Sequence, residues 1–194
     1  MHDAPVMARQ PDTAKPPDAR IELVAYDPAW PAAFERECQS LTQALAPWLV
    51  GPPQHIGSTA VPGLMAKPVI DIMAPVQSLA AARPAIVAAA RLSYLHAPYQ
   101  QALMHWFCKP SPHLRTHHLH LVPAGSARWQ AQLAFRDALR ADAGLRAEYA
   151  ALKQQLALLH PQDRDAYTAA KAPFIAKVLG PLGLASGSGQ DAVA

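Results

Sequence analysis

The chain has 194 residues, of which 51% are hydrophobic and 16% charged, so it can bury one sizeable core and a single domain is the default. Seventeen Lys and Arg against 14 Asp and Glu give a net charge of +3 with no basic run. This charge favours anions such as nucleotides, but nucleic acid is not an expected partner. The longest apolar stretch, LAAARPAIVAAARL, is interrupted by Arg83, Pro84 and Arg91, which excludes a membrane span there.

The two ends of the chain differ in composition from the middle. Residues 1–20 are rich in Pro, Asp and Arg and lack the apolar run of a signal peptide, which predicts a disordered leader. Residues 181–194 have the small-residue composition of a flexible tail. Between them we expect one domain over residues 21–180. Cys38 and Cys108 lie within apolar patterns, which indicates reduced core thiols and a cytoplasmic protein.

Ordered structure is predicted to begin with a strand and a helix. Residues 21–26 (IELVAY) alternate well enough for a strand, and Asp27-Pro28 favours a helix start. In the helix that follows, apolar residues recur at spacings of 3 and 4, as one stripe of an amphipathic helix. These residues are Trp30, Phe34, Cys38, Leu41, Leu45 and Trp48. Residues 51–53 (GPP) then stop the helix, and a short strand runs into Ile56.

The middle of the chain predicts further strands. A brief helical turn is expected across Thr59–Met65, and residues 69–73 (VIDIM) read as a central strand covered on both faces. A helix is predicted between Ser78 and Leu92, with its start delayed or its axis kinked by Pro84. Two further strands, at 103–109 and 116–122, are joined by the turn-forming PSPHLR, which predicts a hairpin.

From Ser126 onward the pattern indicates helices only, in roughly three stretches. Their apolar positions are Trp129, Leu133 and Leu139, then Tyr149, Leu152, Leu156 and Leu159, then Tyr167, Phe174, Ile175 and Val178. We therefore expect an α+β fold. A mixed β-sheet with flanking helices would occupy about residues 21–123, and a C-terminal helical layer about residues 126–180.

Gly57 and Ser58 stand between a predicted strand and a predicted helical turn. Glycine lets the backbone approach a ligand, and the exposed N–H groups of this turn, with the Ser58 hydroxyl and Thr59 beside it, can bind phosphate oxygens. The alternative is a tight turn with a helix cap.

Asp71 lies on a hydrophobic strand, where a carboxylate has no packing reason to exist. Aspartate is rarely buried without a partner. A divalent metal, Mg²⁺ or Mn²⁺ by preference, shared with the phosphates of a substrate is the partner we expect. The alternatives are a loop cap or an ion pair with Lys67 or an arginine.

The strand THHLHLV offers further metal ligands. His118 and His120 lie two residues apart and project from the same face of a strand, whereas His117 faces the other way. If this strand neighbours the Asp71 strand, one carboxylate and two imidazoles could converge, a set that suits Mn²⁺, Fe²⁺ or Zn²⁺ better than Mg²⁺. His55 could join them. Histidines that are half-buried and hydrogen-bonded on a sheet are the alternative.

Basic residues near the predicted strand ends could meet the phosphates of a substrate. We expect this of Lys67, Lys109 and Arg115, although such residues are also ordinary at solvated strand edges. Arg136 and Arg140 lie one turn apart on a predicted helix. They could form a basic face toward a ligand-binding cleft, or they could tie the helical layer to the sheet.

Five ordered motifs together resemble the GrpB family, over approximately Ile21–Leu179. They are YDPAWPAAFERE, HIGSTAVPGLMAKPVIDI, THHLHLV, FRDALR and EYAALK. The resemblance implies a nucleotidyltransferase-like fold, in which a Gly-Ser turn cradles the triphosphate and strand carboxylates hold two metal ions. It also implies a link to dephospho-CoA kinase, because some members are fused to that enzyme and are described as accessory to it.

Carried over to this chain, Gly57 and Ser58 match the Gly-Ser turn, and Asp71 matches the first carboxylate of an Asp-x-Asp pair. Met73 stands at the second position. A lone carboxylate leaves too little negative charge to hold and bridge two Mg²⁺ ions. This departure puts the family's expected two-metal mechanism in question.

Three functions therefore stay open. The first is a metal-dependent nucleotidyl or phosphoryl transferase, in which Asp71, His118 and His120 are the catalytic and metal-binding residues. The second is an accessory module that binds a nucleotide or CoA-related ligand without turnover. The third is a His/Asp transition-metal site that acts without a nucleotide.

Overall fold

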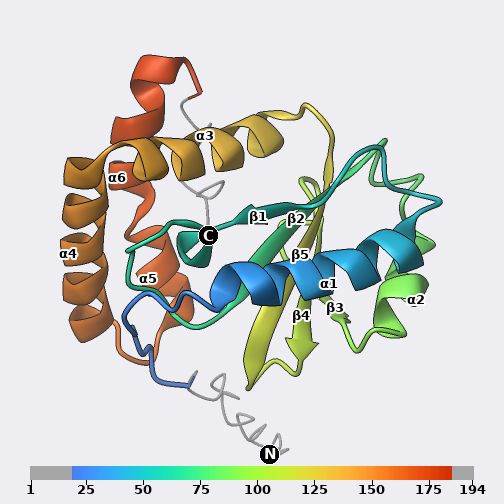
Figure 1. Cartoon of the computed structure of the whole chain (residues 1–194), viewed down its shortest axis with the longest axis horizontal. Helices are drawn as coiled ribbons and strands as arrows, with labels where there is room; N and C mark the ends of the chain where they lie inside the picture. The colour runs from blue at the N-terminus through green and yellow to red at the C-terminus, as the bar shows by residue number, and fades with distance from the viewer. Residues whose placement is uncertain (1–18, 185–194) are drawn as a thin grey trace, which may run out of the picture.

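A computed structural model describes residues 19–184, and within them five strands form one mixed sheet with helices beside it (Figure 1). The strands are β1 (Gln54–Ile56), β2 (Ile70–Val76), β3 (Leu95–Ala97), β4 (His105–Pro110) and β5 (Arg115–Pro123). Their order is β1-β2-β5-β4-β3, with β2 and β5 parallel and the other neighbours antiparallel. The predicted α+β class is confirmed. Residues 1–18 and 185–194, which hold most of the predicted leader and tail, lie outside the described residues.

The helices follow the predicted stripes closely. They are α1 (Trp30–Leu45), α2 (Ala85–Ala90), α3 (Ala127–Ala141), α4 (Ala143–Leu159), α5 (Arg164–Ala169) and α6 (Ala172–Leu179), with the 3-10 turns η1 (Ser58–Ala60) and η2 (Gly180–Leu182). The predicted stripe of α1 is confirmed, because Trp30, Phe34, Leu41 and Leu45 are all buried. Among the described helices, none is long and apolar enough to cross a membrane.

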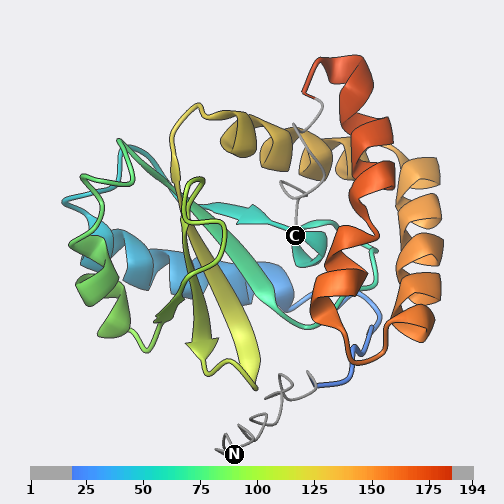
Figure 2. The ribbon, with the colours of Figure 1, turned by 180° about the vertical axis from the view of Figure 1, so that it is seen from behind.

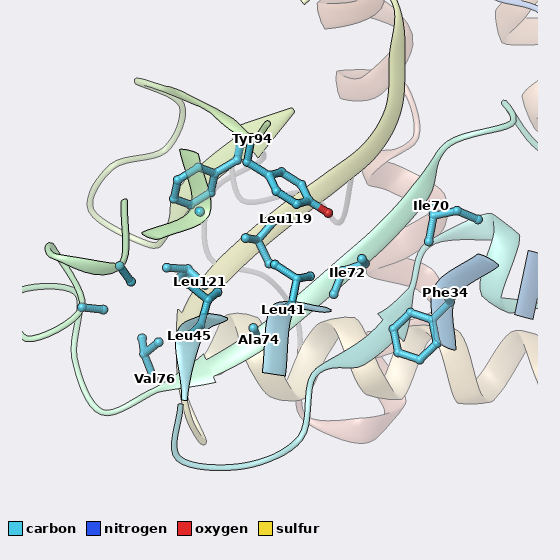
Figure 3. Packing of buried hydrophobic residues seen from close by; sticks show 14 of the residues in the cluster. Phe34, Leu41, Leu45, Ile70, Ile72, Ala74, Val76, Tyr94, Leu119 and Leu121 are labelled. Carbon is cyan, nitrogen blue, oxygen red and sulfur yellow. The ribbon is translucent and has the colours of Figure 1, made fainter. Parts of the chain in front are cut away.

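One face of the sheet packs against α1 and α2. Successive residues of a strand point to opposite faces, so Ile72 of β2 and Leu119 of β5 point the same way and meet Leu41 of α1 in the main apolar cluster (Figure 3). Full burial of each such side chain contributes about 1.5–3 kcal/mol. This cluster holds β2 and β5 at the centre of the sheet, and so sets which of their residues face the other way.

The opposite face is apolar at one end and polar at the other. Met73, Trp106 and Val122 belong to a second buried cluster, which Trp129 and Leu133 of α3 cover. Figure 2 shows this face, with α1 behind the sheet and α4, α5 and α6 standing to its side. The side chains of Asp71, His118 and His120 project from the same face as Met73.

The C-terminal helices have a core of their own. The ring of Tyr149 on α4 lies 5.2 Å from that of Phe135 on α3 and 5.1 Å from that of Phe174 on α6, measured between centroids. The third predicted helical stretch divides into α5 and α6. The cause is Pro173 in the first turn of α6, which has no N–H for a hydrogen bond to a preceding helical turn. The division leaves Lys171 at the N-cap of α6.

The strand predicted at residues 21–26 is wrong. Among these residues only Val24 forms a β-bridge, to Ala66. The N–H of Ile21 donates instead to the carbonyl of Pro161, at 2.8 Å. The segment is thus held between the sheet and the helical layer and does not run along a strand edge.

Smaller differences have local causes. The turn predicted over Thr59–Met65 is helical only at Ser58–Ala60, and the backbone bends again at Gly63, where φ is +78°. The helix predicted between Ser78 and Leu92 begins after Pro84, which confirms the late start. The hairpin is confirmed as β4 and β5. Strand β3 was not predicted, because three residues are too few to show a period.

Candidate metal and phosphate site

Three candidate metal ligands converge on one sheet face. In the parallel pairing of β2 and β5, Asp71 lies opposite His118 and Met73 lies opposite His120. The Nδ1 atom of His118 is 2.8 Å from Oδ1 of Asp71, and the Nε2 atom of His120 is 3.9 Å from the same oxygen. The conditional prediction of a carboxylate and two imidazoles at one point is met, because the two strands are neighbours.

The three residues have the geometry and chemistry of a metal site. One candidate ligand atom from each lies within 4.8 Å of the others. Both ring nitrogens of His120 and Nε2 of His118 are buried without a hydrogen-bond partner among the described residues. Buried polar atoms of this kind are costly unless something satisfies them. A metal ion held by Oδ1 of Asp71, Nδ1 of His118 and Nε2 of His120 would give the last of these atoms a partner. The donor set suits Mn²⁺, Fe²⁺ or Zn²⁺.

Electrostatics favour a charged carboxylate at Asp71 and a neutral imidazole at His120. Burial by itself would raise the pKa of Asp71, but the hydrogen bond from His118 and the electrostatic interactions with His118, His120 and Lys67 outweigh it, so the pKa is lowered. Burial, together with the charge of Arg128, lowers the pKa of His120 to about 3. Carboxylate and neutral imidazole are the forms that bind metals.

The Gly57-Ser58 turn lies directly against the carboxylate. The antiparallel pairing of β1 with β2 puts Ile56 opposite Asp71, so the chain turns at Gly57 just beside it. Gly57 has φ +70° and ψ −172°, a combination that essentially only glycine adopts. A Cβ atom there would collide with Oδ2 of Asp71. Glycine is therefore needed both for the turn and for its closeness to Asp71.

Two arginines anchor this turn from α3. Nη1 of Arg136 donates to the carbonyl of His55 at 3.1 Å, and Nε of Arg140 donates to the carbonyl of Ala60 at 2.9 Å. The second of the two alternatives for these residues is confirmed, because they tie the helical layer to the sheet. Arg136 and Arg140 do not line the cavity described next.

A cavity of about 610 Å³ opens between the sheet and the helical layer. Asp71, His118, Ser58 and Thr59 line it, whereas His120, 1% exposed, lies behind them. Its basic lining residues are Lys67, Arg115, Lys153, Arg164 and Lys171, and its aromatic ones are Tyr99, Trp106 and Tyr167. Five basic side chains against the carboxylates of Asp71 and Asp165 give the lining an excess of basic groups, which attracts anions.

Thr59 takes a supporting place in this lining. Its hydroxyl donates to the carbonyl of Val69 at 3.1 Å and lies 3.0 Å from Nε2 of His55. The Thr59 hydroxyl is thus used to hold η1 against the start of β2. The Ser58 hydroxyl is therefore the better candidate to bind a phosphate oxygen.

His55 and Lys109 were predicted in the site, but both lie on the opposite face of the sheet. His55 pairs with Ile72, and its ring stacks on Phe34 of α1 at 4.7 Å between centroids. Nζ of Lys109 lies 2.8 Å from Oε1 of Glu37 on α1. The reason is the strand alternation, which turns both side chains toward α1 and away from Asp71.

Three basic lining residues from the helical layer were not predicted. Lys153 and Lys171 are buried, and Arg164 begins α5. The sequence did contain one indication of Lys153. It follows Tyr149 by four residues and precedes Leu156 by three, so a lysine occupies the apolar stripe of α4. The position of Lys171 depends on the break between α5 and α6, which the spacing alone did not reveal.

Comparison with known proteins places the chain among bacterial relatives. The model of the GrpB protein family matches residues 20–180. A UPF0157 protein of Pseudomonas aeruginosa is 39% identical over 169 residues, covering 84% of this chain and 68% of that protein. The crystal structure of conserved protein GrpB from Enterococcus faecalis has a TM-score of 0.74 and 33% identity, covering 82% of this chain and 96% of that one. A protein of Mycolicibacterium paratuberculosis named dephospho-CoA kinase is 33% identical to this chain. The match covers 80% of this chain and 44% of that protein.

Proposed function

The chain belongs to the GrpB family, and on this premise we propose that it binds a phosphorylated small molecule together with a divalent metal held by Asp71, His118 and His120. The observation that carries the proposal is that a possible metal triad and five basic side chains meet at one cavity. A metal ion and a basic lining are complementary to phosphate oxygens, which bind both.

The aromatic lining supports an organic group on the phosphate. Tyr99 and Trp106 lie with ring centroids 5.9 Å apart at the sheet side, and Tyr167 lines the helical side. The guanidinium of Arg115 lies 5.3 Å from the centroid of Trp106. Rings of this kind stack on planar groups such as nucleobases. A nucleotide, or a CoA-related phosphate ester, is therefore the ligand class that we propose.

Metal-dependent nucleotidyl or phosphoryl transfer is the reaction that best fits such a ligand. The metal, when bound, would polarise a phosphoryl oxygen and neutralise developing charge. Gly57 lets the backbone of the turn approach the ligand, and the Ser58 hydroxyl can orient a phosphate oxygen. Asp71 and His118 face the cavity and would hold the metal from the sheet side, with His120 behind them.

One observation favours a second candidate, an accessory module that binds its ligand without turnover. The side chain of Met73 is fully buried beside His120, within the cluster that contains Trp106 and Val122. The position of a second carboxylate is thus filled by core packing. The partial match to a protein named dephospho-CoA kinase makes dephospho-CoA a ligand to test, and that kinase a candidate partner.

Isothermal titration of the chain, purified without a His-tag, tests the proposal. We expect Mn²⁺ or Zn²⁺ to bind with a stoichiometry near one and more tightly than Mg²⁺. We further expect ATP, CTP, GTP or dephospho-CoA to bind at least about tenfold more tightly when the metal is present. Absence of binding under every pairing of metal and ligand would refute the proposal. Product analysis separates the candidates, because the accessory module binds but transfers nothing.

A further inference from the structure

Three lysines gather along one part of the cavity, two from the helical layer and one from the sheet side. Lys67 precedes β2, Lys153 lies on α4, and Lys171 is the N-cap of α6. Nζ of Lys67 and Nζ of Lys171 lie 5.1 and 5.0 Å from the ring centroid of Tyr167. Lys153 is 2% exposed and Lys171 is 5% exposed. Ammonium groups from three separate elements therefore converge beside the proposed metal triad.

The two buried lysines have no acidic partner. No carboxylate of a described residue lies within ion-pair distance of Lys153 or Lys171. Lys153 donates instead to the Ser58 hydroxyl at 3.1 Å and to the carbonyl of Met65, both of which are neutral. Lysine is almost never fully buried unless it is paired. Buried cations that line a cavity with no carboxylate within ion-pair distance indicate that the missing partner is an anionic ligand.

The charged and titratable groups that surround Lys153 and Lys171 affect the pKa values of these two lysines. Lys67 and Asp71 face them from the sheet side, Tyr149 from α4, and Arg164, Asp165 and Tyr167 from α5. Burial, followed by the charge of Lys67, lowers the pKa of Lys153 to about 7. Burial, followed by the charges of Lys67 and Lys153, lowers the pKa of Lys171 to about 7, with Asp71 opposing.

We infer that Lys67, Lys153 and Lys171, with the Ser58 hydroxyl, form a subsite for a dianionic phosphate group, such as the terminal phosphate of a phosphorylated ligand. The inference takes its ligand class from the proposed function but does not depend on the metal. Two negative charges suit a cluster of three cations, whereas a phosphodiester offers only one. An anion favours the charged lysines, so its binding near neutral pH draws protons from solution.

Calorimetric titration with pyrophosphate tests the subsite. The full chain is kept metal-free with a chelator, at pH 7.5, in two buffers of different ionisation enthalpy. We expect binding with net proton uptake, and an affinity that falls as the pH rises from 7 to 9, because free Lys153 and Lys171 lose their protons over this range. Dimethyl phosphate, a monoanion, is expected to bind at least about tenfold more weakly.

Lysine variants locate the binding. Lys153→Met and Lys171→Met are each expected to weaken pyrophosphate binding about tenfold to a hundredfold and to reduce the proton uptake. Lys177→Met is the control, because that lysine lies on α6 with its side chain 59% exposed. Lys171 makes no side-chain hydrogen bond with a described residue, so Lys171→Met should fold and melt at a higher temperature than the wild type without ligand.

The outcomes separate this inference from the proposed function. Wild-type affinity for pyrophosphate in both lysine variants, binding without proton uptake, or equal affinity for dimethyl phosphate would overturn the subsite. Metal binding and pyrophosphate binding in Lys177→Met should both equal those of the wild type. If the wild type binds pyrophosphate through the lysines but binds no metal, the subsite stands and the metal-dependent function does not.

Discussion

Replacing Asp71 with asparagine is expected to lower the affinity for Mn²⁺ or Zn²⁺ by at least about a hundredfold. Asparagine keeps the shape of the side chain but removes the only negative charge among the three candidate ligands. Loss of a group that merely supports a metal ligand costs 10- to 100-fold in affinity, so loss of the carboxylate ligand itself should cost more. Calorimetry measures the affinity, and elemental analysis of the purified variant measures the bound metal.

Strand β5 provides matched variants for this experiment. His118→Ala and His120→Ala are expected to lose the metal, whereas His117→Ala should retain it. His117 immediately precedes His118 in the sequence but pairs with Lys109 and points to the α1 face. Equal loss of metal in His117→Ala and His118→Ala would show that the effect is a general disturbance of the strand and contradict the assignment of the ligands.

The substitution Gly57→Ala is expected to disturb both the turn and the carboxylate. The backbone angles at Gly57 disfavour any side chain, at a cost of about 1–3 kcal/mol. The new Cβ would also collide with the Asp71 carboxylate, which must then move away from His118. We therefore expect a free energy of unfolding lower by about 2–4 kcal/mol in total, and at least tenfold weaker metal binding. Chemical denaturation and calorimetry measure the two effects.

Gly63→Ala separates backbone strain from the collision. Gly63 also has a positive φ, +78°, but a Cβ there would meet no atom within 4 Å. It should destabilise the chain by about 1–2 kcal/mol and leave metal affinity at the wild-type value. If Gly57→Ala and Gly63→Ala prove equally mild and both bind metal normally, the close approach of the turn to Asp71 has no functional role.

The sheet and most helices could be predicted because their patterns are long. The stripe of α1 covers four turns, and β5 is nine residues long, with His and Leu alternating from His118 to Leu121. Where a segment is short, or where the segment it packs against is far away in the sequence, the local residue pattern does not predict its structure. Residues 21–26 look like a strand by alternation, yet only Val24 finds a partner, and whether an extended segment pairs depends on tertiary contacts.

Half of the candidate site could be predicted for a similar reason. Asp71, His118 and His120 share a face because alternation along two strands is local, and only the pairing of those strands had to be assumed. The same alternation, applied to His55 and Lys109, would have placed them opposite Ile72 and His117, but only once the register was known. The lysines of the cavity come from elements far apart in the chain, so no spacing could bring them together.

The proposed metal triad and the lysine subsite together require that a metal and a phosphate lie side by side in the cavity. Anomalous diffraction from crystals grown with Mn²⁺ and pyrophosphate tests this. We predict one manganese peak within coordination distance of Asp71, His118 and His120, with a phosphate group between that peak and the ammonium groups of Lys153 and Lys171. A fully occupied manganese site elsewhere on the chain, with none at the triad, would contradict the account.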